Sequence, residues 1–396
     1  MKEKIVIIGN GISGVTCARY IRKFSDHEIL IISKETPYFF SRTALMYVYM
    51  GHMKFEHTQP YENYFWEKNR IDLKQDLVTE VDTDNKSLVL KSGEKISYDR
   101  LILATGSKPN KFGWTGQDLP GVQGLYSKQD LDALEETTKD GIQRAVIIGG
   151  GLIGIEMAEM LLSRNYPVTF LVREDKFWGN VLPAEESEMI MRHMREHQID
   201  IRLNTELKEV KAGADGKAKS IITNHGEEID CQVVGLTAGV SPNIDFLKSS
   251  KIDLKRGILV DKHLQTNIEG VYAIGDCAEF IQNPASDRKN IEQVWYTGKI
   301  MGKTLATTIC KEKVVYDPGH WFNSAKFMDI EYQTYGWVFP EPKEGEEHFY
   351  WEHAKGKKSI RLCFESDSRK FVGVNCFGIR LRHQAFDKWL NEASSI

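Results

Sequence analysis

The sequence predicts an α/β protein in which one strand–turn–helix–strand module occurs twice, followed by a small α+β segment. The first module begins with KIVIIGNGISG at residues 4–14, and the second begins with RAVIIGGGLIG at 144–154. In each, an apolar run precedes G-x-G-x-x-G, a helix-like segment follows it, and another apolar run comes next, at 28–32 and 168–172. This order and spacing are typical of a βαβ unit.

The repeat extends beyond the glycine turns. LILATGSKPN at 101–110 is similar to VGLTAGVSPN at 234–243, since both are apolar runs that reach a small residue and glycine, with Pro-Asn shortly after. A repeated module is a stronger indication than either turn alone, because single G-x-G-x-x-G matches are common. The sequence therefore predicts two Rossmann-like domains.

Glycines at these spacings indicate dinucleotide binding. The first glycine makes the tight turn, the second lets the backbone approach a pyrophosphate, and the third lets the helix pack on the strand. The free N–H groups at the helix N-terminus then face the phosphates. Two turns predict two dinucleotides, FAD and NAD(P)H, because a flavin can take a hydride and release single electrons. The residues expected at these turns are Gly9, Gly11, Ile12, Ser13, Gly14, Gly149, Gly151, Ile153 and Gly154.

Composition narrows the class of protein. The chain has 396 residues, 27% of them charged, and a net charge of -4, which argues against general nucleic-acid binding. None of its six cysteines has C-x-x-C spacing, so we expect reduced thiols, no metal and a cytoplasmic protein. We also expect no signal peptide and no membrane helix, because no apolar run is long enough.

A third glycine element, GVYAIGD at 270–276, helps to place the flavin. The apolar run 271–274 reads as a buried strand that ends at Gly275-Asp276. An acid at the carboxyl end of a strand beside a Rossmann turn can accept hydrogen bonds from a ribityl hydroxyl. The alternative is that Asp276 caps the segment that follows.

The order of these motifs resembles the two-dinucleotide-fold flavoproteins, the pyridine nucleotide–disulfide oxidoreductase superfamily, over most of the chain. The resemblance implies that the first fold binds FAD and the second binds NAD(P)H. It also implies a discontinuous FAD domain at 1–115 and 245–315, an inserted NAD(P)H domain at 116–244, and a C-terminal α+β domain at 316–396.

The segment PYFFSRTAL at 37–45 indicates the branch of that superfamily. The disulfide branch has C-x-x-x-x-C here, and a peroxidase and coenzyme A branch has a single cysteine. This chain has Arg42 instead, and no cysteine between Cys17 and Cys231. Thiol–disulfide relay chemistry therefore has no nucleophile at the flavin.

PYFFSRTAL instead resembles the P-Y-x-R-P-x-L-S segment of the rubredoxin reductases, the ferredoxin reductases and the apoptosis-inducing-factor group. WFNSAKFMDIEYQTYG at 321–336 resembles their F-W-S-x-Q-Y…Q-x-x-G segment. Three positions depart from these relatives: Thr43 replaces a proline, Tyr47 stands where a lysine is frequent, and Asn323 replaces a tryptophan.

The resemblance implies several FAD contacts. Arg42 would contact the pyrophosphate, unless it is a surface arginine, and Ser33 or Glu35 would bind the adenosine ribose. A helix N-terminus near Glu292, Gln293 and Trp295 would direct amides at the flavin pyrimidine and stabilise the anionic reduced flavin. Trp295 has the alternative of a core aromatic. The remaining residues expected at FAD are Val78, Ala104, Thr105, Gly106, Gly275 and Asp276.

For the nicotinamide nucleotide, Glu156 resembles a family glutamate that accepts from the carboxamide and so positions the nicotinamide. The alternative is an exposed helix residue. Arg173 and Glu174 follow the second strand, where an acid prefers the 2′-OH of NAD and an arginine accommodates the 2′-phosphate of NADP. The spacing to Glu174 favours NADH, with NADPH as the alternative. Gly239 is also expected at this site.

From about residue 317 the chain becomes rich in aromatic residues. SIRLCFE and KFVGVNCFG have the alternation of antiparallel strands, and HQAFDKWLNEA is typical of a helix. These features indicate a small α+β domain. By resemblance, such a domain packs on the flavin and often mediates homodimers.

Three functions remain open from the sequence. The first is an electron-transfer reductase that passes electrons from NAD(P)H through FAD to a small redox protein such as rubredoxin or ferredoxin. The second is a quinone dehydrogenase at a membrane surface, suggested by the weakly basic amphipathic segment GIRLRHQAFDKWL. The third is a redox sensor without turnover. In the reductase the flavin carries the chemistry, and no side chain is assigned as catalytic.

Overall fold

The computed structural model describes residues 2–285 and 287–395, which form two compact units. The first unit consists of Met1–Lys108, Ser127–Gln129 and Val240–Pro318. The second consists of Pro109–Tyr126, Asp130–Gly239 and Gly319–Ile396. The three-domain division stays a prediction, because the segment from residue 319 onward belongs to the same unit as the second glycine turn.

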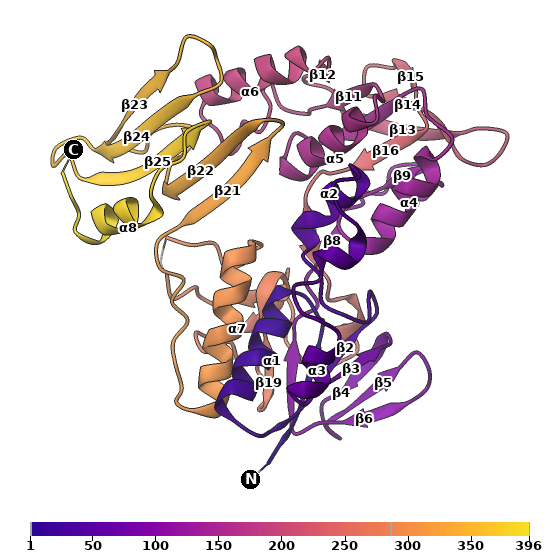
Figure 1. Cartoon of the computed structure of the whole chain (residues 1–396), viewed down its shortest axis with the longest axis vertical. Coiled ribbons are helices and arrows are strands. Elements are labelled where there is room, and N and C mark those ends of the chain that lie inside the picture. The colour runs from indigo at the N-terminus through magenta and orange to yellow at the C-terminus, as the bar shows by residue number, and fades with distance from the viewer. Residues whose placement is uncertain (1, 286, 396) are drawn as a thin grey trace. The chain divides into compact units, whose positions relative to one another are not determined.

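A five-stranded parallel sheet forms the centre of the first unit. Its strands, in spatial order, are β19 (Val271–Ala273), β7 (Arg100–Leu103), β1 (Lys4–Ile8), β2 (Glu28–Ser33) and β3 (Ile71–Gln75). Apart from the edge strand β3, these strands are mostly apolar because helices cover a parallel sheet on its faces. The covering helices include α1 (Ile12–Phe24) and α7 (Trp295–Cys310), which run side by side in Figure 1.

Smaller elements complete the first unit. An antiparallel sheet contains β4 (Val78–Asp82), β5 (Ser87–Leu90) and β6 (Lys95–Ser97), and a parallel pair contains β18 (Ile258–Val260) and β20 (Ala278–Phe280). Two short helices are α2 (Leu45–Tyr49) and α3 (Tyr64–Lys68). The chain passes between the units near β8 (Ser107–Pro109) and β17 (Val240–Pro242).

The second unit repeats the parallel architecture. Its sheet has the order β12 (Asp200–Arg202), β11 (Val168–Leu171), β10 (Ala145–Ile148), β16 (Val233–Leu236) and β9 (Val122–Gln123). The helices are α4 (Lys128–Thr138), α5 (Leu152–Ser163) and α6 (Ala184–Glu196). An antiparallel sheet contains β13 (Leu207–Ala212), β14 (Ala218–Thr223) and β15 (Glu228–Asp230). The two predicted Rossmann-like folds are therefore confirmed.

The C-terminal segment forms an antiparallel sheet in the second unit. Its order is β21 (Phe322–Phe327), β22 (Ile330–Gly336), β25 (Phe371–Phe377), β24 (Ser359–Glu365) and β23 (Glu346–Glu352). The helix α8 (His383–Asn391) lies against this sheet (Figure 1), with the Phe386 ring stacked 5.0 Å from that of Tyr335. The predicted α+β segment is confirmed.

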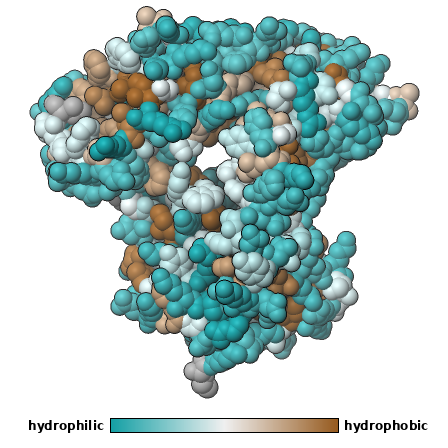
Figure 2. All heavy atoms as spheres, in the orientation of Figure 1, coloured by the Kyte–Doolittle hydropathy of each residue, from teal (hydrophilic) through white to brown (hydrophobic). Residues whose placement is uncertain are grey.

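The visible face is mostly hydrophilic, and one of its hydrophobic patches lies over the C-terminal sheet (Figure 2). Among the described residues, no helix is both long and apolar enough to cross a bilayer.

Candidate functional site

The first glycine turn fits closely against the strand beside it. Gly9 has φ +112°, and a Cβ added there would lie 2.1 Å from the carbonyl oxygen of Ala104. A Cβ on Gly14 would lie 2.2 Å from the carbonyl oxygen of Gly9. A Cβ on Gly11, by contrast, would meet no atom within 4 Å. The backbone at Gly11 is therefore open to a ligand, which is the arrangement that a pyrophosphate needs.

The second glycine turn has the same construction. Gly149 has φ +108°, and its added Cβ would lie 2.9 Å from Cα of Ala238 and 3.0 Å from the carbonyl oxygen of Thr237, which corresponds to Ala104 in the repeat. A Cβ on Gly154 would lie 2.8 Å from the carbonyl oxygen of Gly149, and one on Gly151 would meet nothing within 4 Å. Each unit thus contains one cradle that a dinucleotide fits, as the repeat predicted.

Three glycines bring α1, α7 and the turn after β19 together around Ser13. A Cβ on Gly275 or Gly298 would lie 2.3 Å or 2.6 Å from the Ser13 hydroxyl oxygen. A Cβ on Gly302 would lie 2.5 Å from the Ser13 carbonyl oxygen. The backbones of α1 and α7 therefore lie close together at Ser13. The turn at Gly275 packs against the start of α1 at the same place.

Both of these helices begin without a side-chain cap. Gly11 is the N-cap of α1, Val294 is the N-cap of α7, and neither makes a capping hydrogen bond from its side chain. The first N–H groups of both helices are thus left for other acceptors. A helix N-terminus also carries a partial positive charge, which suits phosphates and an anionic ring. The expected helix start near Trp295 is confirmed.

Asp276 lies directly after β19, in a short 3₁₀ turn whose N-cap is Ile274. Its carboxylate therefore does not cap that turn. One oxygen, Oδ2, accepts a hydrogen bond of 3.1 Å from Ser107 Oγ, which in turn accepts one of 2.8 Å from Gln293 Nε2. Burial raises the pKa of Asp276, while the Ser107 bond and the charge of Arg42 act against that rise. A half-buried acceptor of this kind suits a hydroxyl donor.

Glu35 and Arg42 bind each other in the structure. Arg42 donates from Nη1 and Nη2 to the two carboxylate oxygens of Glu35, at 2.8 Å and 2.7 Å. The backbone N–H of Lys128 donates to the same carboxylate at 2.8 Å. The expected roles of Glu35 at the ribose and Arg42 at the pyrophosphate stay predictions, and either role has to coexist with this pair.

Asn10 is a residue of this region that sequence reasoning missed. It is buried between the first two glycines, donates 2.9 Å to the Thr36 carbonyl oxygen, and accepts 2.9 Å from Ser33 Oγ. It therefore connects the glycine turn to the loop after β2. A polar residue inside G-x-G next to a buried strand was the available signal.

The other residues expected at FAD lie close to these elements in the first unit. Thr105 Oγ1 donates 2.8 Å to the Asn243 carbonyl oxygen, and Gly106, with φ +65°, accepts 2.9 Å from the Asn243 N–H. Ala104 and Val78 are buried, Val78 as the first residue of β4. Their contacts with FAD stay predictions.

Glu292 is buried, and both of its carboxylate oxygens have partners within the protein. Arg288 Nη1 donates to Oε1 at 3.2 Å, and the Tyr316 hydroxyl donates to Oε2 at 2.8 Å. Burial raises the pKa of Glu292, and these two partners oppose the rise. Glu292 thus anchors the segment before α7. Trp295 is 39% exposed, so it is not the core aromatic that was the alternative.

Glu156 lies in the first turns of α5, after the second glycine cradle, and is half-buried. Burial, together with the nearby charge of Glu159, raises the pKa of Glu156 to about 7. Glu159 itself pairs with Lys326 of β21, with Oε1 and Nζ 2.8 Å apart. The carboxyl group of Glu156 thus titrates near neutral pH, and its contact with the carboxamide stays a prediction.

Arg173 and Glu174 follow β11 and pair with each other. Arg173 Nη2 donates 3.0 Å to Glu174 Oε1, and Arg173 is the more exposed of the two. The carbonyl oxygen of Glu174 accepts 3.0 Å from the Asn204 N–H, which fixes the turn. Of the other two residues expected at this nucleotide, Ile153 is half-buried in α5, and Gly239 has φ +87°.

None of the six thiols is activated. All are free cysteines, five of them are buried, and Cys310 is half-buried. Burial raises the pKa of every one, to about 12 for Cys231, Cys363 and Cys376. A redox-active cysteine needs the opposite environment, which favours the thiolate.

Comparison with known proteins agrees with this architecture. The family model described as pyridine nucleotide-disulphide oxidoreductase matches residues 3–299, and the chain belongs to that family. An NADH-rubredoxin oxidoreductase of Clostridium acetobutylicum is 32% identical over 71% of this chain and 70% of its own length. The assimilatory nitrate reductase electron transfer subunit of Bacillus subtilis is 28% identical over 95% of this chain, which spans 48% of that relative.

A solved ferredoxin reductase from Rhodopseudomonas palustris has the same fold, with a TM-score of 0.86 at 21% identity over 95% of this chain and 91% of its own. The chain is therefore an oxidoreductase whose cofactors are FAD and a nicotinamide nucleotide, as the two glycine turns predicted. The two cradles described above fit these two ligands.

Proposed function

We propose that the chain is an FAD-dependent NAD(P)H reductase that passes electrons from the nicotinamide through the flavin to a small electron-transfer protein of the rubredoxin or ferredoxin type. Bound FAD supplies hydride acceptance and one-electron release. The chain's own residues bind and orient the two nucleotides.

The main observation that supports this proposal is that the cysteine thiols are buried and not activated. A disulfide-type member of the family would need a thiolate that receives electrons from the flavin, yet burial raises the pKa of all six cysteines. In the first unit the cysteines are Cys17, Cys277 and Cys310, and the first two are fully buried. Electrons therefore leave the flavin for an external acceptor.

We assign FAD to the cradle of Gly9, Gly11 and Gly14, with Asp276 as the acceptor for a ribityl hydroxyl. Two features support this assignment: the half-buried carboxylate next to Ser107, and the start of α7 held beside the start of α1. We assign the nicotinamide nucleotide to the cradle of Gly149, Gly151 and Gly154, which lacks such an acid at the corresponding strand end.

The quinone alternative gains no support from α8. Its apolar face packs on the C-terminal sheet, where Phe386 is buried and its ring lies 5.9 Å from that of Phe371. A helix docked in this way does not offer its apolar face to a bilayer. The six unpaired cysteines are consistent with our placement of the protein in the cytoplasm, where thiols stay reduced.

The proposal is tested by electron transfer before and after thiol alkylation. NADH should bleach the bound flavin under anaerobic conditions, and added rubredoxin or ferredoxin should then reoxidise it. Treatment with N-ethylmaleimide should leave both steps unchanged, since Cys310 is partly exposed and the other five thiols are buried.

The Cys310→Ala variant is the matched control, because it removes the most accessible thiol. If alkylation stops acceptor reduction in the wild type but not in Cys310→Ala, the effect comes from the Cys310 thiol. The proposal that electrons pass from the flavin to the acceptor without a thiol is then wrong. If NADH reduces the flavin but only a soluble quinone reoxidises it, the acceptor is a quinone. If no acceptor supports turnover, the redox-sensor function holds instead.

A further inference from the structure

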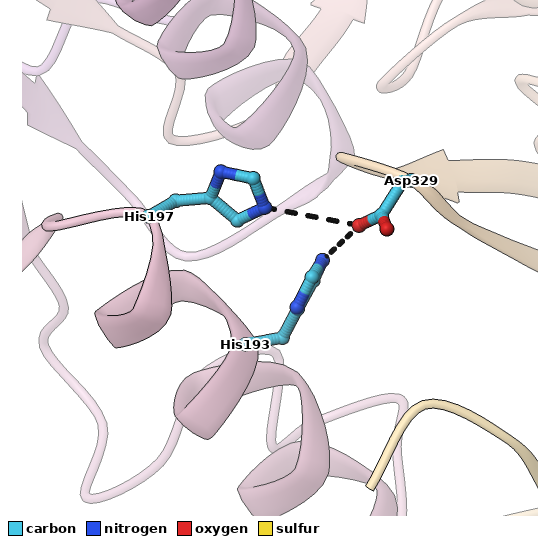
Figure 3. Close-up of side chains that lie close together, drawn as sticks. All are labelled: His193, His197 and Asp329. Carbon is cyan, nitrogen blue, oxygen red and sulfur yellow. Dashed lines mark ion pairs between the residues drawn. The ribbon is translucent and has the colours of Figure 1, made fainter. Parts of the chain in front are cut away.

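Two histidines and an aspartate meet on the second unit, away from both glycine cradles along the chain. His193 lies in the last turn of α6, and His197 is the C-cap of that helix, four residues later. Asp329 lies in the tight turn between β21 and β22, after Met328 with φ +54°. Figure 3 shows both imidazoles and the carboxylate directed toward one another.

The three side chains lie nearly close enough to bind one metal ion together. His197 Nε2 lies 3.7 Å from Asp329 Oδ1, and His193 Nε2 contacts the same oxygen. The ligand atoms of all three residues lie within 4.8 Å of one another. In a tetrahedral zinc site with bonds of about 2.0–2.2 Å, neighbouring ligand atoms are about 3.3 Å apart, so small side-chain rotations suffice.

Histidines at i and i+4 lie on the same face of a helix, which is why two imidazoles can share one ion. Two imidazole nitrogens and one carboxylate oxygen are donors that suit Zn²⁺ and neighbouring divalent transition metals. Three protein ligands leave one position for water. That position can face solvent here, because His197 and Asp329 are 42% and 62% exposed while His193 is 1% exposed.

A further carboxylate orients the buried imidazole. Glu196 Oε2 lies 3.3 Å from His193 Nδ1. With the proton on Nδ1, this contact leaves the Nε2 lone pair directed at the shared position. Histidines that bind metals generally donate their other N–H to a carboxylate or carbonyl in this way.

The charges around the three residues suit a cation. The Nζ of Lys357 lies 3.6 Å from Asp329 Oδ2 and 3.6 Å from Glu196 Oε2, the oxygen that also contacts His193 Nδ1. With neutral imidazoles, Asp329, Glu196 and Lys357 sum to one negative charge. Oδ1 of Asp329 remains on the side of the histidines, where an ion would bind.

A second cluster lacks these properties. Glu346, His348 and Cys363 lie together on β23 and β24. This cluster offers one imidazole instead of two, and its Cys363 thiol donates to Glu346 Oε2 at 3.7 Å.

We propose that His193, His197 and Asp329 form a divalent transition-metal site, with Zn²⁺ as the best-suited ion, that joins α6 to the turn between β21 and β22. This departs from the expectation of no metal drawn from cysteine spacing. The site is structural. It holds the C-terminal sheet to the Rossmann-like part of its unit and takes no part in electron transfer.

The test measures metal binding by the full-length flavoprotein, without an affinity tag, after treatment with a chelator. Zn²⁺ should bind with one-to-one stoichiometry in calorimetry and should raise Tm. His197→Gln and Asp329→Asn change exposed side chains and should fold, yet each should lose the stoichiometric binding and the rise in Tm. Cu²⁺ added to the oxidised protein should give an EPR signal coupled to two nitrogens.

His225→Gln serves as the matched control, because His225 is an exposed histidine of the same unit whose Nε2 contacts the Asn204 carbonyl oxygen. This variant should bind Zn²⁺ as the wild type does. The proposal is overturned if wild type and His197→Gln bind Zn²⁺ equally, if the wild type binds none at micromolar concentration, or if the Cu²⁺ signal shows no nitrogen coupling.

Discussion

Arg361 of β24 and Glu186 of α6 form a buried ion pair, with Nε and Oε2 3.3 Å apart. Arg361 also donates 2.7 Å to Glu185, at the exposed start of the same helix. Burial raises the pKa of Glu186 to about 7, and the charge of Arg361 opposes that rise. The C-terminal sheet is thus connected to α6 through a charge that water does not reach.

Removal of Arg361 should therefore destabilise the second unit strongly. Arg361→Met leaves Glu186 buried without its cation, which costs about 3–5 kcal/mol. For a unit of this size that corresponds to a fall of roughly 10 °C in Tm. Differential scanning calorimetry of the holoprotein measures the change, and Arg361→Met with Glu186→Gln should recover part of it.

The control for this prediction is Arg380→Met, in the segment between β25 and α8. Arg380 donates 2.6 Å to Glu331 of β22, but both side chains are exposed, so the fall in Tm should be far smaller than for Arg361→Met. Equal losses in Arg361→Met and Arg380→Met would show that burial of the first pair does not matter.

Glu156 should give the protein a pH dependence near neutrality. Its pKa of about 7 in the folded chain lies above the ordinary value of 4.5, so the folded state retains a proton that the unfolded state loses. The contribution to stability is complete below about pH 4.5 and is lost as pH rises to about 7, after which it is constant.

Replacement by glutamine removes this titration. Tm of Glu156→Gln should fall less between pH 5 and 7 than Tm of the wild type. Asp26→Asn is the control, because Arg70 lowers the pKa of that exposed carboxyl and its titration lies at more acid pH. A wild-type profile that Glu156→Gln leaves unchanged would contradict the prediction.

The two cradles should respond separately to the same substitution. Gly11→Ala and Gly151→Ala add a methyl group that meets no protein atom within 4 Å, so both variants should fold. Gly11→Ala should weaken FAD retention by about tenfold or more, equivalent to about 1.4 kcal/mol. Gly151→Ala should keep FAD and raise the KM for NADH. Flavin absorbance after gel filtration and steady-state kinetics measure these effects.

Gly14→Ala distinguishes a ligand effect from a packing effect. Its methyl group would lie 2.2 Å from the Gly9 carbonyl oxygen, so this variant should lose Tm even without FAD. If Gly11→Ala binds FAD normally, or if Gly151→Ala loses FAD, the assignment of the two cradles is reversed or wrong.

Nucleotide choice should depend on Glu174. Its carboxylate would accept from the ribose hydroxyls of NADH and repel a 2′-phosphate, so NADH should be preferred by about tenfold or more. Glu174→Ala should narrow that preference in stopped-flow flavin reduction, while the more exposed Arg173 should tolerate Arg173→Ala. A preference for NADPH that Arg173→Ala abolishes would make Arg173 the specificity residue.

The sequence predicted the two folds and both cradles because the signal is local and repeated. Gly9 and Gly149 must have positive φ beside a strand that ends in a small residue, and both halves of the chain show that pattern. The small α+β segment was predictable for a similar reason, since alternation along β24 and β25 is visible within seven residues.

The interactions that the sequence did not predict join segments distant in the chain. Arg361 and Glu186 are 175 positions apart, and nothing near either residue indicates its partner. The same holds for His193 and Asp329, and for Tyr316 with Glu292. Glu35 and Arg42 are only seven positions apart, but the sequence pattern was interpreted for each residue only as a contact with FAD.

The contact of Gly302 with the Ser13 carbonyl oxygen has a consequence for charge transfer. A spacing set by backbone atoms does not vary with side-chain rotamers, so the partial charges at the starts of α1 and α7 stay in place when a bound ligand gains or loses an electron. Fixed dipoles of this kind need little reorganisation. A methyl group at Gly302 would force the helices apart, because it would lie 2.5 Å from the Ser13 carbonyl oxygen. The reduction potential of a cofactor between those two helix ends would then follow the backbone rather than any single side chain.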